Sequence, residues 1–510
     1  MAPSKLRIAV IGAGVSGIAA ASIFNRQGHS TVLFEKGRTV GGVWANTYPG
    51  VSLQNNARHY ALTEFPWPFT PDYHPSGEQI RRYLGQAVEG LGLDVRTQHT
   101  VVRLDERDRG WLVHCRHPDG EAAEPFDFVL IANGQYSGRK HAHRFPGQDD
   151  FGGAVLTERD IDDLSIFDNK TTAVIGFGKS AVDMASTAVA GADRVHHVFR
   201  TRRWLVPYHI LGLVYSQIFF CRAGTVLMKS WAHPTRVERF IHRRMNWLVA
   251  GNWAGVTSLM RRMCLSHARG LDASAQRRLR TVMPDHDFVG DLRSAAALAP
   301  PGYYSQVARG EIVPHHAELR RFTRTGIELS DGSSIDCDQV LLCLGSATPS
   351  FPFLPEPYRQ LVETEPDGVQ LYRHLIHPEI RNLAFSGYNH GFLHIPTVEV
   401  ATLWLCAMLR GDITLPATAD MLASIERIRS WKRDHIHFEP SRSCAVNTRF
   451  QQYLDILLLD LGLSPYRKLP NLLAEVFAEY DARDYAGLAD EYEHRRTRMT
   501  LPRPVLPLDT

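Results

Sequence analysis

Short apolar runs alternate with helix-spaced apolar positions through the N-terminal part of the chain. Runs that predict strands lie at residues 6–11, 31–34, 171–175 and 195–199, and the segment inside each pair has helical spacing. Strand–helix–strand order of this kind is typical of a parallel sheet covered by helices. The pattern therefore predicts an α/β fold with two Rossmann-like domains.

Weaker signals organise the rest of the chain. Strands are predicted at residues 311–313, 326–329, 339–344 and 383–387. Helices are predicted at residues 398–409, 453–461 and 472–477. These signals divide the chain into four parts. Residues 1–165 form a first nucleotide domain, and residues 166–335 form a second one with a helical insertion at about 208–300. Residues 336–415 return to the first domain, and residues 416–510 form a C-terminal helical region.

A glycine-rich turn joins strand to helix in each predicted unit. The first turn runs from Gly12 to Gly17 as GAGVSG, and the next strand ends in Glu35. The second runs from Gly176 to Ala181 as GFGKSA, and its next strand ends in Arg200. Glycines in such turns let the backbone approach a pyrophosphate that rests on the helix N-terminus.

The two strand ends predict two different dinucleotides. An acid such as Glu35 accepts hydrogen bonds from ribose hydroxyls, whereas Arg200 suits a 2′-phosphate, with Arg202 or Arg203 as the alternative. We therefore expect FAD at the first turn and NADPH at the second. The structural alternative is a pair of strand–turn–helix corners whose Glu35 and Arg200 are merely solvated.

Composition and cysteine usage narrow the class of protein. At 510 residues with a net charge of +3, the chain exceeds one typical core and is an ordinary globular protein. Its seven cysteines are scattered without a CxxC pair, which favours reduced thiols in the cytoplasm and argues against a disulfide reductase. The strongest candidate membrane segment, residues 204–221, contains Pro207 and several polar residues, and is interpreted as a buried or interfacial helix.

The predicted insertion is strongly basic. Residues 222–280 contain twelve Lys or Arg residues and two acids. A solvated face is the simplest interpretation, and the alternatives are an anionic substrate or carrier, or peripheral contact with an acidic membrane. Interleaved apolar residues fit an amphipathic lid: Trp231, Phe240, Trp247, Trp253 and Leu259. No nucleic-acid-binding motif accompanies the charge, so nucleic acid is not expected as a partner.

A series of short motifs after Glu35 resembles one enzyme family. Gly41–Trp44 reads GGVW, Tyr48–Gly50 reads YPG, Leu53–Asn56 reads LQNN and Phe65–Pro68 reads FPWP. Together with GFGKSAVD at Gly176–Asp183, this order resembles the flavin-containing monooxygenases, a branch of the class B flavoprotein monooxygenases related to the Baeyer–Villiger monooxygenases. The resemblance implies an enzyme that uses FAD, NADPH and O2.

The resemblance also implies which residues hold the cofactors. Those expected at FAD are Gly12, Gly14, Val15, Ser16, Gly17, Glu35, Lys36, Gly42, Val43, Trp44, Gln54, Asn55, Val101, Gly134 and Gly387. Those expected at NADPH are Gly176, Gly178, Lys179, Ser180, Ala181, Arg200 and Thr201. Asn55 is the candidate catalytic residue beside the reactive edge of the flavin, with a turn-stabilising role as the alternative. His390 and His394 are weaker candidates on the substrate side, and no metal site is expected.

The resemblance implies oxygen transfer from a C4a-(hydro)peroxyflavin to a soft nitrogen or sulfur of a small or medium organic substrate. Two departures from the family pattern keep alternatives open. Thr157 stands where the family fingerprint has a His, so an NADPH-dependent flavin reductase or oxidase is one alternative. A flavin-holding interaction protein that uses the basic insertion is a further one. Gln54 stands where the Baeyer–Villiger branch expects an Asp, which disfavours ketone or aldehyde oxygenation without removing it.

Overall fold

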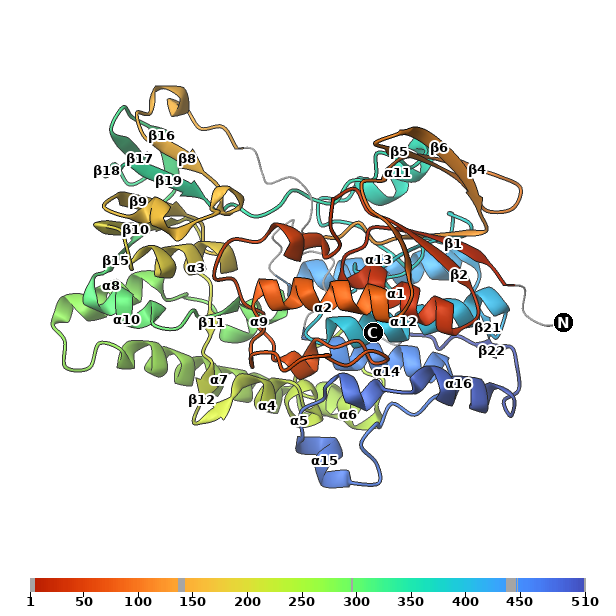
Figure 1. The fold of residues 1–510 in the computed structure, drawn as a ribbon. Helices are drawn as coiled ribbons and strands as arrows, with labels where there is room; N and C mark the ends of the chain where they lie inside the picture. Colours follow the sequence, from red (N-terminus) through yellow and green to blue (C-terminus); the bar gives the residue numbers. More distant parts are fainter. Residues whose placement is uncertain (1–4, 136–142, 295–296, 437–445, 447, 509–510) are drawn as a thin grey trace.

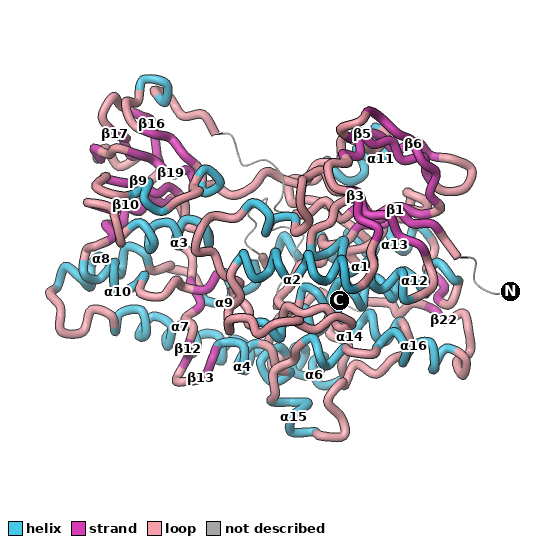
Figure 2. Tube along the Cα trace, viewed as in Figure 1, coloured by secondary structure: helices cyan, strands magenta, loops and turns pink. Residues whose placement is uncertain are grey.

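The computed structural model describes residues 5–135, 143–294, 297–436, 446 and 448–508. Strands gather in two groups in the upper part of the molecule, and helices form the layer beneath them (Figures 1 and 2). This arrangement is the predicted α/β fold with two Rossmann-like sheets. Among the described residues, no helix is long and apolar enough to cross a membrane.

The first sheet is parallel and has the order β20-β7-β1-β2-β3. Its strands are β1 (Arg7–Ile11), β2 (Ser30–Phe34), β3 (Asp94–Arg96), β7 (Phe128–Ile131) and β20 (Leu383–Phe385). The return from residues 383–387 to this sheet is therefore confirmed. Helix α1 (Val15–Arg26) packs along α12 (His394–Arg410). Helix α12 begins before the predicted residue 398, because Pro396 lies in its first turn, where no intrahelical N–H is needed.

The second sheet is also parallel and has the order β15-β10-β9-β19-β8. Its strands are β8 (Ala154–Leu156), β9 (Thr171–Ile175), β10 (Arg194–Phe199), β15 (Ile312–His316) and β19 (Gln339–Leu342). Helix α3 (Lys179–Ala188) packs against β9 and β10. Strands β8 and β19 pair within this sheet, so both belong to the second domain. The boundaries predicted at residues 165 and 336 instead left both strands in the first domain.

Two small antiparallel sheets extend the parallel ones. Strands β4 (Thr100–Glu106), β5 (Trp111–His117) and β6 (Gly120–Phe126) form one of them beside the first sheet. Strands β16 (Leu319–Phe322), β17 (Gly326–Leu329) and β18 (Ser334–Asp336) form the other. The turn that joins β17 to β18 contains Asp331 and Gly332, as predicted.

The predicted insertion is largely helical but starts with short strands. Its helices are α4 (Tyr215–Phe219), α5 (Arg222–Thr225), α6 (Arg236–Arg244), α7 (Asn246–Ser266), α8 (Ala273–Val282) and α9 (Phe288–Ser294). The segment interpreted as one helix, residues 204–221, instead contains β11 (Leu205–Val206), β12 (His209–Ile210) and β13 (Leu213–Val214) before α4. That interpretation was wrong because Pro207 and Gly212 break the run into a hairpin.

The remaining helices complete the core. They are α2 (Gly77–Gly90), α10 (Tyr303–Arg309), α11 (Glu356–Glu363), α13 (Thr418–His435), α14 (Phe450–Asp460), α15 (Leu472–Phe477) and α16 (Leu488–Arg496). Helix α14 packs on α12, and one apolar cluster joins the first sheet, the insertion and the C-terminal helices. The C-terminal region therefore shares a core with the first domain.

Candidate cofactor and active site

One large cavity lies where the carboxyl ends of both parallel sheets face each other. Its volume is about 1730 Å³, and both glycine-rich turns line it. Pockets for one small molecule or cofactor typically have volumes of about 300–1,000 Å³. The cavity therefore has room for more than one such ligand, with one wall from each sheet.

The first turn is a backbone cradle. Gly12 has φ +110°, and a Cβ there would lie 2.5 Å from the carbonyl oxygen of Ala132. Gly14 is the N-cap of α1, and no side chain caps this helix. The first N–H groups of α1 are thus left for an anion at the cavity wall, which fits the pyrophosphate of a dinucleotide.

Glu35 closes the end of β2 beside this turn. Its carboxylate accepts hydrogen bonds from the backbone N–H groups of Ala13, at 2.9 Å, and Gly37, at 2.7 Å. The side chain is buried and still lines the cavity. A carboxylate has about four acceptor positions, so the two backbone bonds fix Glu35 and leave acceptor positions for ribose hydroxyls.

The second turn repeats the first. Gly176 has φ +126°, and a Cβ there would lie 2.5 Å from the carbonyl oxygen of Cys343. Gly178 is the N-cap of α3, which also has no side-chain cap. Beneath the turn, His197 contacts the carbonyl oxygen of Gly176 through Nε2 at 2.7 Å and the hydroxyl of Tyr303 through Nδ1 at 2.9 Å. Burial lowers the pKa of His197 to about 4, so this support is a neutral imidazole.

Three arginines follow β10, and they differ in their ion-pair partners. Arg200 and Arg203 both line the cavity. Arg202 pairs with Asp285, and Arg203 pairs with Asp291 at 3.0 Å. The guanidinium of Arg200 is exposed, lines the cavity and has no ion-pair partner among the described residues. The geometry therefore favours Arg200 over its two neighbours as the reader of a 2′-phosphate.

The GGVW segment passes close to the first turn. A Cβ on Gly42 would lie 3.0 Å from Cα of Gly14, so the two backbones are nearly in contact. Trp44 donates a hydrogen bond from Nε1 to the hydroxyl of Tyr60 at 2.8 Å, which fixes the indole at the cavity wall. This packing encloses the cavity near the first turn.

The loop before α12 closes the cavity on the other side of the first turn. Gly387 has φ +87°, and a Cβ there would lie 2.7 Å from Oγ of Ser16. The same hydroxyl contacts Nε2 of His394, the first residue of α12, at 2.9 Å. His394 and His390 both line the cavity. Burial lowers the pKa of His394 well below its usual value, so its ring is neutral.

Asn55 lies between this loop and the insertion. Its Nδ2 donates to the carbonyl oxygen of Phe392, and its Oδ1 lies 3.4 Å from the hydroxyl of Tyr215. Tyr215 also donates to the backbone oxygen of Gln54 at 2.7 Å. The side chain of Gln54 accepts the N–H of Leu298 at 2.7 Å, so it anchors strand β14 (Ala297–Leu298). Both residues line the cavity while holding the insertion to it.

A hydrogen bond to a carboxylate links the two nucleotide domains. The hydroxyl of Tyr48, in the YPG turn, donates to one carboxylate oxygen of Asp183 on α3 at 2.7 Å. Lys179 pairs with the other oxygen at 2.8 Å. Burial and the neighbouring Asp183 raise the pKa of Tyr48, which keeps its hydroxyl protonated as a donor. The second turn is therefore held directly against the first domain.

Nearly all of the predicted cofactor residues line the cavity. These are Gly12, Gly14, Val15, Ser16, Glu35, Lys36, Gly42, Val43, Trp44, Gln54, Asn55, Val101, Gly134, Gly176, Gly178, Lys179, Ser180, Arg200, Thr201 and Gly387. Gly17 and Ala181 do not line it. They are the third positions of the two turns, where the family pattern requires close packing of helix on strand, and a Cβ on Gly17 would lie 2.0 Å from the carbonyl oxygen of Gly12.

Several lining residues were not predicted from the sequence. They include Asn133, Glu158, Arg159, Ser346, Phe353 and Phe392. Asn133 and Ser346 follow β7 and β19, and their position after a parallel strand was a usable signal. Thr157, at the fingerprint position, caps a short 3-10 helix: its hydroxyl accepts from the N–H of Arg159 and donates to Asp160. It is not among the lining residues described.

No disulfide joins the described cysteines. Six cysteines are described, all free and buried, and Cys444 lies outside the described residues. The described part of the chain contains no group of His, Cys, Asp and Glu that could hold a metal ion.

Two family models and several curated proteins are similar to the chain. Residues 9–209 match the model of the pyridine nucleotide-disulphide oxidoreductases, and residues 305–478 match that of the flavin-binding monooxygenase-like proteins. A probable flavin-containing monooxygenase 1 of Arabidopsis thaliana is 29% identical, over 96% of this chain and 97% of its own. A dimethylaniline monooxygenase (N-oxide-forming) of Rattus norvegicus is 24% identical, over 90% of this chain and 83% of its own.

Solved structures agree in fold. The S-allyl-L-cysteine S-oxygenase of Allium sativum superposes with a TM-score of 0.62 and 18% identity, over 98% of this chain and 100% of its own. The two turns, their cavity and the family matches therefore lead to one conclusion. The chain is similar, over nearly its whole length, to the class B flavoproteins of the flavin-containing monooxygenase type.

Proposed function

We propose that this monooxygenase transfers one oxygen atom from O2 to a soft nitrogen or sulfur centre of a small or medium organic molecule. In this proposal FAD lies at the first turn and NADPH at the second. The observation that carries the assignment is the pair of helix N-termini on one cavity that no side chain caps. Glu35 lies beside one of them, and Arg200, without an ion-pair partner in the described part of the chain, lies beside the other. When bound, the two cofactors supply hydride transfer and dioxygen activation.

The protein residues supply binding and orientation. The N–H groups of α1 and α3 hold the two pyrophosphates, because both helix ends lack a protein cap. Glu35 accepts ribose hydroxyls while its backbone bonds hold it in place. Arg200 contacts the 2′-phosphate. The contact between Tyr48 and Asp183 keeps the two halves of the site in register.

Asn55 is the proposed residue at the reacting centre. Its amide has two N–H donors, and the carbonyl of Phe392 uses one of them. The other is free to hydrogen-bond an oxygen atom in the cavity. Asn55 also positions Phe392, so its role in this proposal is both contact and support.

Aromatic side chains next to Asn55 keep water away from the reacting centre. Phe220 stacks on Phe392 with ring centroids 4.9 Å apart, and Phe450 packs against Phe220 at 5.5 Å. Tyr215 meets Phe220 edge to face. A wall of this kind suits an apolar substrate and protects a reactive oxygen species from water.

The choice of a soft heteroatom rests on two observations. Gln54 occupies the position where the Baeyer–Villiger branch expects an Asp, and its side chain is engaged by Leu298. One sequence relative is named for N-oxide formation. The test is a panel of tertiary amines, thioethers and ketones with NADPH, in which products are identified by mass spectrometry. Esters or lactones from the ketones, without N-oxides or sulfoxides, would assign the alternative Baeyer–Villiger reaction.

A flavin reductase or oxidase is the second candidate. Thr157, at the fingerprint position, is bonded to Asp160, so it does not replace the family His at the cavity. This function would consume NADPH and release hydrogen peroxide with no oxygenated product from any compound of the panel.

A further inference from the structure

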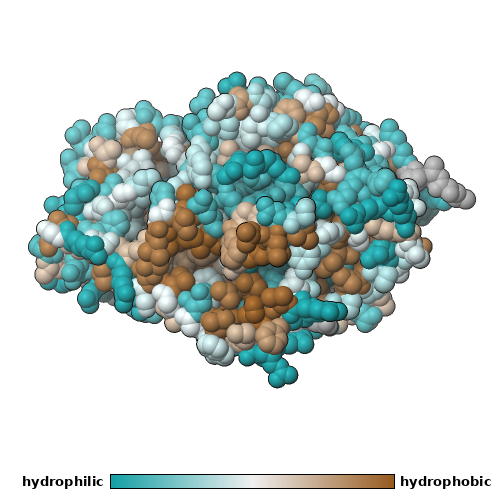
Figure 3. All heavy atoms as spheres, turned by 90° about the horizontal axis from the view of Figure 1, so that it is seen from below, coloured by the Kyte–Doolittle hydropathy of each residue, from teal (hydrophilic) through white to brown (hydrophobic). Residues whose placement is uncertain are grey.

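Large apolar side chains gather on the face that lies at the bottom of Figure 1. Seen from below, brown side chains cover the middle of this face, with hydrophilic ones around them (Figure 3). We call this surface the apolar face and define it by residues that are 59–78% exposed: Leu211, Val237, Phe240, Trp247, Leu472, Leu473 and Phe477. Monomeric soluble proteins rarely expose so many large apolar side chains on one side.

Helix α7 lies along this face and has an uncharged start. The sequence contains no charged residue between Arg244 and Arg261. The exposed positions of this stretch are Asn246, Trp247, Leu248, Ala250, Gly251, Ala254, Gly255 and Ser258. A solvated helix face normally carries charges, so this one is suited to an apolar surrounding.

Arginines flank the apolar positions. Arg236, Arg243 and Arg244 are exposed on α6, and Arg262 is exposed on α7 after the uncharged stretch. Between residues 194 and 271 the sequence has a single acid, Glu238, which is 4% exposed and accepts hydrogen bonds from Thr235 and Gln452. The charge presented by this part of the face is therefore positive.

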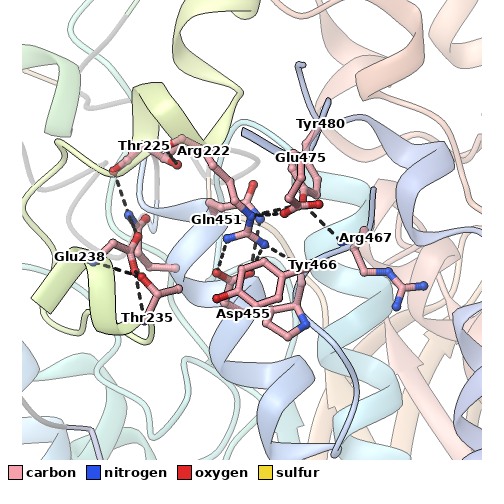
Figure 4. Close-up of polar contacts among 12 residues, drawn as sticks. Arg222, Thr225, Thr235, Glu238, Gln451, Asp455, Tyr466, Arg467, Glu475 and Tyr480 are labelled. Atoms are coloured by element: carbon pink, nitrogen blue, oxygen red, sulfur yellow. Dashed lines mark hydrogen bonds and ion pairs between the residues drawn. The ribbon is translucent and has the colours of Figure 1, made fainter. Parts of the chain in front are cut away.

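A buried ionic network holds the elements of the apolar face together. Arg222 on α5 binds both oxygens of Asp455 on α14, at 2.7 and 3.1 Å, and pairs with Glu475 on α15 (Figure 4). Glu238 on α6 accepts a hydrogen bond from Gln452 on α14 at 3.1 Å. Helices α6 and α15 are thus both anchored to α14, and Arg222 itself is unavailable to a partner.

We propose that the apolar face docks on an anionic lipid surface, with α7 in the plane of the interface. Apolar side chains enter the boundary between headgroups and acyl chains, while the flanking arginines contact lipid phosphates. A second copy of this chain fits less well. A two-fold contact would set this face against itself, with arginines opposite arginines, and neither Glu238 nor Glu475 is exposed to pair with them.

Vesicle flotation tests the proposal without turnover, so its outcome is independent of the proposed function. The purified holoprotein is mixed with phosphatidylcholine vesicles that contain or lack phosphatidylglycerol. We expect binding to the anionic vesicles, and a blue shift of tryptophan fluorescence because Trp247 is 71% exposed. The double variant Arg243→Gln/Arg244→Gln should bind about 30-fold more weakly, at about a factor of five per arginine.

Controls separate docking from misfolding and from dimerisation. Arg320→Gln/Arg324→Gln removes the same charge from exposed positions on the second nucleotide domain and should leave vesicle binding unchanged. Phe240→Ser/Trp247→Ser should abolish binding while the flavin content and Tm stay as in the parent. Absence of binding to anionic vesicles overturns the proposal. A dimer in sedimentation that the Phe240/Trp247 variant dissociates, without vesicle binding, assigns the face to a second copy instead.

Discussion

Replacement of two glycines of the first turn by alanine is predicted to have different effects, one on stability and the other on cofactor binding. A Cβ on Gly17 would lie 2.0 Å from the carbonyl oxygen of Gly12, so α1 and β1 must move apart by about 1 Å to reach the shortest contact that Cβ atoms adopt. Overpacking of this kind costs about 1–3 kcal/mol, against less than about 1 kcal/mol gained from alanine in a helix. Gly17→Ala should therefore lower the stability of the apoprotein itself.

Gly14→Ala should leave the fold intact and affect the cofactor. The added Cβ would lie 3.4 Å from Cα of Gly42, an ordinary contact, and φ of −79° suits alanine. Gly14 lines the cavity, so the methyl group enters the space proposed for the FAD pyrophosphate. Loss of one charge-assisted hydrogen bond, about 1.5–3 kcal/mol, raises the Kd for FAD by about 10–150-fold.

The assay compares apoproteins by thermal unfolding and titrates FAD by quenching of its fluorescence. The expected result is a lower apoprotein Tm for Gly17→Ala, and a nearly unchanged Tm with weakened FAD binding for Gly14→Ala. Parent-like FAD affinity in Gly14→Ala would refute the placement of the pyrophosphate. An unchanged apoprotein Tm in Gly17→Ala would refute the packing role of Gly17.

Three further substitutions test separate parts of the structure. Arg200→Ala should lower the preference for NADPH over NADH in steady-state kinetics by about 10–150-fold, while Arg202→Ala, which removes a residue already paired with Asp285, should not. His197→Phe removes two buried hydrogen bonds below the second turn, so the unfolding free energy should fall by about 1–3 kcal/mol and KM for NADPH should rise. An unchanged KM would mean that His197 stabilises the fold without supporting NADPH binding. Burial raises the pKa of Glu399 to about 8, so the native state keeps a proton that the unfolded state releases near 4.5, and stability falls as pH rises between these values. Glu399→Gln should abolish this fall, and its free energy of unfolding at pH 7 should exceed that of the parent by about 3 kcal/mol. Equal Tm values for the variant and the parent from pH 6 to 8 would contradict this prediction.

The local signals in the sequence were sufficient for the turns and for most strands. Strands β9 and β17 have the predicted bounds. The ends of such strands are set by an apolar run and the turn residues beside it, which are all close in sequence. The partners of β8 and β19 depend instead on sheet order, which brings residues 154–156 beside 339–341 across a large separation. No local pattern contains that information, and the two domain boundaries were therefore misplaced.

The candidate site was predictable where backbone chemistry dominates. The position of Gly12, Gly176, Glu35 and Arg200 at one cavity could be predicted, because dinucleotide-binding turns place those residue types at that spacing. Contacts between distant segments, such as Asn55 with Phe392, could not be assigned.

Exposure was the least predictable property. The apolar spacing of residues 472–477 is typical of a core helix, yet Leu472 and Leu473 are 66% and 73% exposed. Periodicity identifies which residues share a face of a helix, but it does not identify what covers that face. The apolar face could therefore be found only from the structure.

The most direct measurement supplies isotopically labelled dioxygen to the holoprotein with NADPH and a panel of tertiary amines and thioethers. Mass spectrometry then follows the label into product, and NADPH consumption and hydrogen peroxide are recorded in the same reaction. The predicted result is one labelled oxygen atom in each N-oxide or sulfoxide formed, in proportion to the NADPH consumed. Stoichiometric labelled hydrogen peroxide with every compound, and no labelled product, would contradict oxygen transfer to a soft nitrogen or sulfur centre.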